Sequence, residues 1–156
     1  MISGNEGELG TVVHTNNFIQ KALVFKRSEV IHQNVAAIMP KVFGETHNSV
    51  LNRYLSTSAE RFNGKERMVP ALRKDGYMLP CIALTKAIPD LTNGIQIIAF
   101  INQHEEKTEE EDVNYEFSYM LYRTDSEIIM GVSKSCYTKY GIHNSLVYGN
   151  PNNSMN

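Results

Sequence analysis

The amino-acid sequence predicts an α+β fold, in which short helices pack on one face of a five-stranded antiparallel sheet. In the first half of the chain, apolar residues recur at helical spacing, most clearly over residues 41–56. In the second half, three apolar runs at 67–72, 77–88 and 95–101 follow one another, separated by turn residues. Runs joined by such short turns form antiparallel neighbours. The predicted order is one strand, several short helices and three consecutive strands.

Composition restricts the classes of protein to which the chain can belong. Its 156 residues suit one domain, with room for part of a second. The hydrophobic share of 42% is typical of globular proteins, and the net charge of −2 gives no basic field for nucleic acid. No apolar run is long enough to span a membrane, so we expect no membrane contact. Cys81 and Cys136 lie far apart, which fits a reducing, cytoplasmic setting, including the cytosolic part of a membrane protein.

The N-terminal part predicts one strand and three short helical pieces. The strand covers residues 9–14, and Asn16 or Asn17 then caps a first helix. A further helical turn is expected at 28–30, and an apolar run at 35–39 is stopped by Pro40.

The stretch over residues 41–56 carries the clearest helical pattern. Its apolar and aromatic residues and one histidine are spaced by three and four positions, so they share one face. His47 therefore points toward the interior. The residues of this face are Phe43, His47, Val50, Leu51 and Tyr54.

The three later strands are separated by clear turn signals. Asp75 and Gly76 supply the positive φ angles that a tight hairpin needs between the first two. An acidic run at 105–112 follows the third strand and is typical of a solvated linker, although the acidic first turn of a helix has the same composition. We therefore expect a domain at 1–104 and a linker at 105–113.

Beyond the linker, a hairpin and a helix are predicted. Strands are expected at 116–123 and 127–132, followed by a helix that begins at Ser133 or Ser135 and is stopped by Gly141. The segment at 114–149 is either the start of a second copy of the first domain or a hairpin and helix that complete it. The tail at 150–156 is polar, and we expect it to be disordered. At an offset of 119 residues, Leu9 matches Ile128, Val13 matches Val132 and Phe18 matches Tyr137.

A series of short motifs carries a resemblance to a known family. In order they are Asn34-Val35, Ile38-Met39-Pro40, His47, Arg53-Tyr54-Leu55, Arg67, Arg73-Lys74-Asp75-Gly76 and Pro80. This series resembles PAS domains over residues 7–104, most closely the oxygen-sensing FixL type, and also PAS domains of multi-pass membrane proteins of protists. The resemblance implies a ligand pocket between sheet and helices. It also implies a first strand before residue 4, which is largely missing here, so we expect the strand at 116–123 to pair beside 9–14, within the chain or in a swapped dimer.

The resemblance implies a haem b site, with His47 as the ligand of the metal. A histidine binds haem iron when its other nitrogen is oriented and water is excluded. Arg53 matches a residue that holds the propionates, and Arg67 matches one that bonds oxygen. The alternatives are a core histidine at 47, a solvated Arg53, and a surface ion pair of Arg67.

The rest of the implied pocket comes from the helix at 41–56 and from two strands. Its strand residues are smaller and more polar than the family's, and Ala99 replaces a glycine that lets haem approach. In flavin-binding PAS domains the reactive cysteine lies in a helical motif that this sequence does not contain. We therefore interpret Cys81 as a buried apolar residue. The lining residues are Leu51, Tyr54, Cys81, Ala83, Ile97 and Ala99.

These features predict a sensory or regulatory domain in signal transduction, not an enzyme. No phosphate-binding loop, nucleophile elbow or paired His-Glu motif is present. The expected signal is a small ligand, including haem for sensing oxygen or redox state, and the expected partner is a second copy or another signalling domain. The alternative is a ligand-free PAS module that mediates protein interaction or dimerisation in a larger protein.

Overall fold

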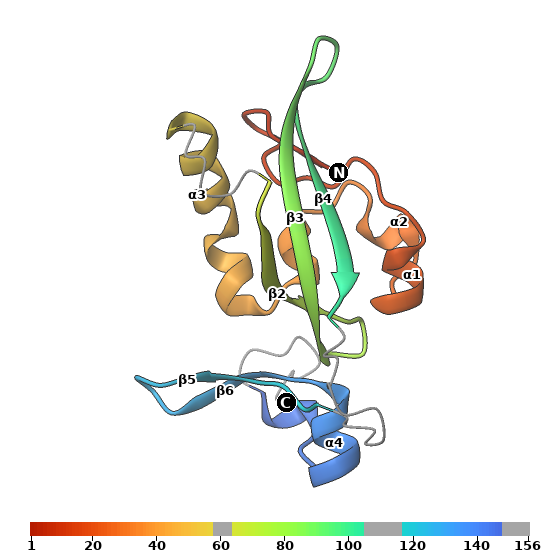
Figure 1. Cartoon of the computed structure of the whole chain (residues 1–156), viewed down its shortest axis with the longest axis vertical. Coiled ribbons are helices and arrows are strands. Elements are labelled where there is room, and N and C mark those ends of the chain that lie inside the picture. Colours follow the sequence, from red (N-terminus) through yellow and green to blue (C-terminus); the bar gives the residue numbers. More distant parts are fainter. Residues whose placement is uncertain (58–63, 105–116, 148–156) are drawn as a thin grey trace.

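The computed structural model describes residues 1–57, 64–104 and 117–147 (Figure 1). Within these ranges the chain is α+β, with a four-stranded antiparallel sheet and a separate two-stranded sheet. The predicted linker at 105–113 and the tail at 150–156 lie outside the described residues. No helix of the described part is long and apolar enough to cross a membrane.

The four-stranded sheet has the order β1-β4-β3-β2. The three predicted strands form it as consecutive antiparallel neighbours, which confirms that part of the sequence analysis. Gly76, with a φ of 82°, turns the chain between the first two of them, as the Asp-Gly pair predicted. The strands are β1 (Ile2–Ser3), β2 (Glu66–Leu72), β3 (Met78–Asp90) and β4 (Gly94–Gln103).

The strand predicted at 9–14, before the helices, does not form. Only Thr11 and Val12 make β-bridges, Thr11 to Asn34 and Val12 to Ile2. Ile2 pairs with Val12 on one side and with Ile97 of β4 on the other, so the short β1 lies between them. The first strand is therefore present before residue 4, although it has only two residues.

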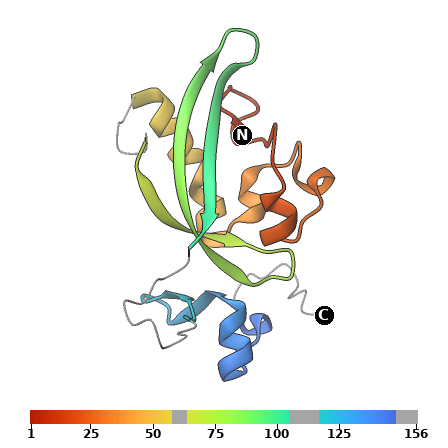
Figure 2. The same cartoon turned by 45° about the vertical axis from the view of Figure 1, so that its right-hand side comes forward.

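Four helical segments lie on one side of this sheet (Figures 1 and 2). α3 lies beside β2, α1 and α2 lie beside β4, and η1 lies behind the strands. The core forms where they meet the sheet, around Leu23, Ile38 and Cys81. The segments are α1 (Phe18–Ala22), α2 (Arg27–Val30), the 3-10 helix η1 (Val35–Ile38) and α3 (Lys41–Thr57).

Residues 117–147 form a small unit, which we call the C-terminal unit. A hairpin of β5 and β6 is followed by α4, and Gly141 ends α4 with a φ of 69°, as predicted. The prediction that the first of these strands pairs beside 9–14 of the same chain is wrong, because β5 and β6 form a separate two-stranded sheet, while Thr11 and Val12 bridge to Asn34 and Ile2. The elements are β5 (Met120–Arg123), β6 (Ile128–Val132), α4 (Lys134–Tyr140) and the 3-10 helix η2 (Asn144–Leu146).

β1 and the segment at Thr11 and Val12 form a first hairpin, which matches the second hairpin, formed by β5 and β6, but not at the predicted offset. Val132 is fully buried, whereas Val13, its predicted match, is 42% exposed. In the first hairpin the buried valine is Val12, which is paired with Ile2, just as Val132 is paired with Met120. The structural offset in the second strand is therefore one residue longer than the sequence comparison predicted.

Candidate functional site

His47 lies on α3 and is partly buried, as predicted. Its Nδ1 atom is buried and bonds to no described residue. Burial lowers the pKa of His47, and a side-chain hydrogen bond with Asn48 opposes this effect only in part, so the imidazole is neutral at pH 7. A neutral imidazole nitrogen without a partner is chemically able to accept a hydrogen bond or bind a metal.

The rest of α3 is less buried than predicted. No residue of this helix is fully buried, and Phe43 is 41% exposed although it belongs to the predicted inner face. Leu51 and Tyr54 are partly buried, whereas Arg53 is exposed, as its solvated interpretation required. α3 is thus the helix of the first domain that is held least firmly against the sheet.

The predicted strand residues lie on one face of the sheet, and three of them are closed off from solvent. Arg67 pairs with Ala83 across β2 and β3. Cys81, Ala83 and Ile97 are 0%, 8% and 3% exposed, whereas Ala99 is partly buried. Burial raises the pKa of Cys81 to about 11, so this thiol is protonated and unreactive at neutral pH.

As packed, these residues do not fit a porphyrin. His47 offers a free nitrogen, but neighbouring side chains cover Cys81, Ala83 and Ile97 and leave no space against them for a macrocycle. Cys81 belongs to the same core cluster as Leu23. A haem would therefore require α3 to move away from the sheet, and the haem site stays a prediction.

Asn48, the neighbour of His47, has a structural role that the sequence analysis missed. Its Nδ2 donates to the carbonyl of Leu9 at 3.1 Å, and its Oδ1 accepts from Asn34 Nδ2 at 3.3 Å. A Cβ at Gly10 would lie 2.5 Å from Asn48 Oδ1, which explains why a glycine, with a φ of 79°, stands there. This network fixes the first hairpin to α3.

The turn between β2 and β3 is built into the core of the C-terminal unit. Tyr77 is 7% exposed and packs in one cluster with Val132, Cys136 and Val147. The rings of Tyr137 and His143 also face it, with centroids 6.3 and 6.1 Å from that of Tyr77. The sequence analysis did not predict this role, because a tyrosine after a hairpin turn is ordinarily a surface residue.

Backbone contacts reinforce this junction. Asn144 Nδ2 donates to the carbonyl of Asp75 at 2.6 Å, and Met78 forms a parallel bridge with Ser133. Arg73 stabilises the turn between β2 and β3. Its Nε and Nη2 donate to the Asp75 carboxylate, and its Nη1 donates to the carbonyl of Ala22. Burial raises the pKa of Asp75, but the hydrogen bonds and charge of Arg73 outweigh it, so the pKa lies below its usual value.

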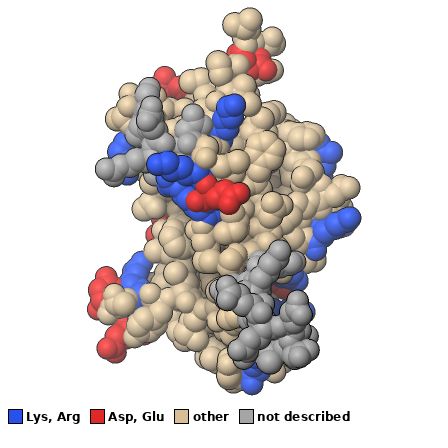
Figure 3. Space-filling model, in the orientation of Figure 1, with Lys and Arg blue, Asp and Glu red and all other residues tan. Residues whose placement is uncertain are grey.

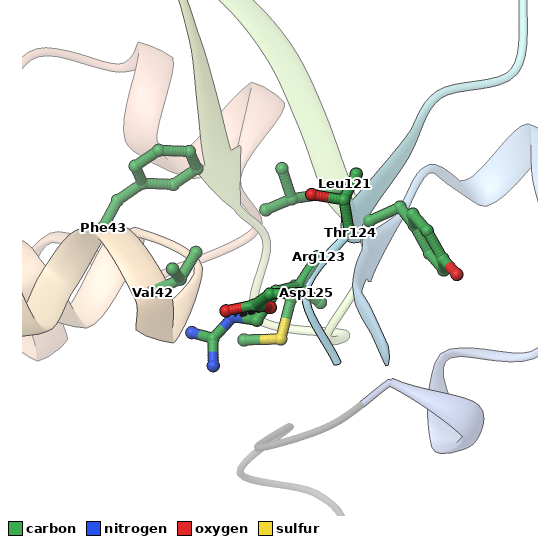
Figure 4. A pocket seen from close by; sticks show the side chains of 8 residues that line it. Val42, Phe43, Leu121, Arg123, Thr124 and Asp125 are labelled. Atoms are coloured by element: carbon green, nitrogen blue, oxygen red, sulfur yellow. Dashed lines mark ion pairs between the residues drawn. The ribbon is translucent and has the colours of Figure 1, made fainter. Parts of the chain in front are cut away.

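A cavity of about 350 Å³ lies between the start of α3 and the β5–β6 hairpin (Figure 4). Val42 and Phe43 line it from α3, and Leu121 faces them from β5. At its rim Arg123 Nε lies 3.9 Å from Asp125 Oδ1, in an ion pair whose side chains are largely exposed. The other lining residues are Tyr122, Thr124 and Met130.

No family model matches this chain. The resemblance to PAS domains therefore rests on the motifs quoted above and stays a prediction.

Proposed function

We propose that this chain is a sensory or regulatory signalling module of the PAS type. In this proposal, a change in the first domain is passed through the β2–β3 hairpin to the C-terminal unit. The observation that carries the proposal is the burial of Tyr77, which is 7% exposed although it follows a hairpin turn. Protein cores are close-packed and deform little. Displacement of this turn would therefore also move Val132 and Cys136, which pack against Tyr77.

The signal enters, in this proposal, between α3 and the sheet. α3 has no fully buried residue, so it can shift at lower cost than α1 or α2, which contribute Ile19 and Val30 to the core. His47 Nδ1 is a buried polar atom on this helix that bonds to no described residue. A small ligand with a hydrogen-bond donor suits this position, and haem is the cofactor that the sequence resemblance implies.

Two α3 variants test the coupling without any knowledge of the ligand. His47→Ala removes a partly buried side chain, whereas Arg53→Ala changes an exposed residue of the same helix. We expect amide exchange in β6 and α4, measured by NMR, to change in His47→Ala and to stay as in the parent in Arg53→Ala. A change confined to α3 would contradict the proposed path.

A haem titration of the same proteins tests the identity of the ligand. If haem binds through His47, a Soret band forms in the parent, is lost in His47→Ala and is kept in His14→Ala, since His14 is exposed. A chain without such a band is no haem sensor, and the exchange experiment then decides on its own whether the module transmits a signal.

A ligand-free dimerisation module is the second candidate, and the outer face of the sheet favours it. Met68 is 55% and Phe100 58% exposed, and their cross-strand partners are Ile82 and Leu84. The face seen in Figure 3 has few charged side chains over much of its area. Light scattering on the titration samples separates the candidates, since a dimer that Phe100→Glu dissociates would support this one.

A further inference from the structure

The backbone just after the short helix α1 is strained. Val24 follows the last turn of α1 and has a φ of 64°. Glycine usually occupies this position after a helix, because a Cβ clashes there with the backbone. Among the described residues other than glycine that have a positive φ, Val24 is the β-branched one, and for such a residue this conformation is a marked outlier.

The side chain of Val24 gains little burial that could offset this strain. It is 47% exposed, whereas Leu23, immediately before it, is 1% exposed, and Phe25, immediately after it, packs against the same core cluster as Leu23. The two neighbours are fixed by their burial, and Val24 has to connect them. Backbone strain of this kind persists only where the surrounding structure imposes it.

The β2–β3 turn supplies the bonds that hold this end of α1. The backbone amide of Lys74 donates to the carbonyl of Leu23 at 2.9 Å, and Arg73 Nη1 donates to the carbonyl of Ala22 at 3.1 Å. The last carbonyls of a helix have no partners inside the helix, and a cation close to them is favourable. The cap of α1 therefore comes from a distant part of the chain rather than from a glycine.

The same turn is held on its other side by the C-terminal unit (Figures 1 and 2). Asn144 Nδ2 donates to the carbonyl of Asp75 at 2.6 Å, and the ring of Tyr77 lies in the core of that unit. A movement of the turn together with the C-terminal unit would therefore break its bonds to α1. A helix of five residues is not stable without such contacts.

We propose that the end of α1 is a conformational switch that the β2–β3 turn controls. In one state the turn bonds to Ala22 and Leu23, and Val24 is held at a positive φ. In the other state the turn has moved with the C-terminal unit, Val24 relaxes to a negative φ, and the last turn of α1 unwinds. The strain at Val24 favours the second state, and the bonds from Arg73 and Lys74 favour the first. This device lets the C-terminal unit act on α1 and does not depend on a ligand at α3.

Val24→Gly tests the strain. Glycine adopts a positive φ without the Cβ clash, so the amides of Lys21 and Phe25, which bond to carbonyls of α1 and its N-cap, should exchange about fivefold more slowly. Val13→Gly is the matched control, since Val13 is also exposed, at 42%, but has no positive φ. It should not slow exchange in α1. Exchange in Val24→Gly that is no slower than in the parent would overturn the proposal.

Asn144→Ala tests the control by the turn. Loss of the bond to the carbonyl of Asp75 should release the turn, so the amides of Lys21 and Phe25 should exchange about fivefold faster, while those of β3 exchange as in the parent. In the Val24→Gly protein the same substitution should have a smaller effect on these amides, because a glycine keeps the end of α1 in place without strain.

Asn5→Ala is the matched control, because Asn5 Nδ2 donates to the carbonyl of Asn93 at 2.7 Å. It removes an equivalent bond from the β3–β4 turn, which lies at the opposite end of the sheet, and should leave exchange in α1 unchanged (Figure 1). Unchanged exchange in α1 of the Asn144→Ala protein, or an equal increase in Asn5→Ala, would contradict the switch. The His47→Ala measurement reads β6 and α4 instead, so it decides separately on the proposed function.

Discussion

Two hairpins in the described part of the chain, β1 with Thr11 and Val12 and β5 with β6, are each followed by a helix, and they differ in what completes them. In the first, Ile2 pairs with Val12, and β4 then extends the sheet on the other side of Ile2. In the second, Met120 pairs with Val132, and the core is closed by Tyr77, which belongs to the first domain. A hairpin and one helix bury too little apolar surface to be stable alone. The first hairpin and its helix are therefore completed within their own domain, whereas the second hairpin and α4 depend on a residue of the first domain.

Replacement of Tyr77 should destabilise the C-terminal unit and leave the stability of the first domain unchanged. Tyr77→Ala removes the largest side chain that crosses the junction, and we expect a loss of about 3 kcal/mol in the stability of the C-terminal unit. Amide exchange resolved by residue measures it, because the amides of β6 and α4 should exchange faster while those of β3 do not.

Tyr140→Ala is the control for this prediction, because Tyr140 is 67% exposed on α4. It should leave both units as stable as in the parent. Uniformly faster exchange throughout the Tyr77→Ala protein would show instead that the two units unfold as one.

High pH should weaken the first domain through Cys81. Its pKa is raised from 9 in the unfolded chain to about 11, so the unfolded state loses its proton first. The stabilisation is complete below pH 9 and is lost as the pH rises from 9 to 11, by about 2.7 kcal/mol in all, of which about half is lost by pH 10. Urea unfolding at pH 7 and pH 10 measures this loss for the parent and for Cys81→Ala. A loss of equal size in Cys81→Ala would assign it to other groups.

The sequence predicted the parts of the fold that depend on local signals. The helix at 41–56, the Asp75-Gly76 turn and the Gly141 stop are each specified by a few neighbouring residues, and the structure contains all three. The five-stranded count failed because Thr11 and Val12 use their backbone in bridges to different partners. Which edge a strand joins is decided by contacts between distant residues, and a single sequence does not contain them.

In the predicted site, too, features set by local sequence were predicted, and features set by contacts between distant residues were not. The periodicity of α3 placed His47 correctly, because facing is a local property of a helix. The closed packing of Cys81 and Ile97 was not predicted, since it depends on side chains from distant helices. The role of Tyr77 was also missed, because its partners lie more than fifty residues later in the chain.

The smallest effect concerns Asn48 of α3, which is bonded to the first hairpin. Its side chain connects α3 to Leu9 and Asn34, in the connection that follows β1. Asn48→Ala removes both bonds, but Asn34 Nδ2 still donates to the Leu9 carbonyl at 3.1 Å, so the acceptor keeps a partner. We therefore expect a loss of only about 1 kcal/mol by urea unfolding, with the largest rise in exchange at α3 and residues 9–12. Asn52→Ala, one turn further along α3 at an exposed position, should have no such effect. Equal loosening of β5 and β6 would mean that α3 reaches the C-terminal unit through the cavity at Val42 rather than through Tyr77, and the comparison of the two hairpins would then have to include that contact.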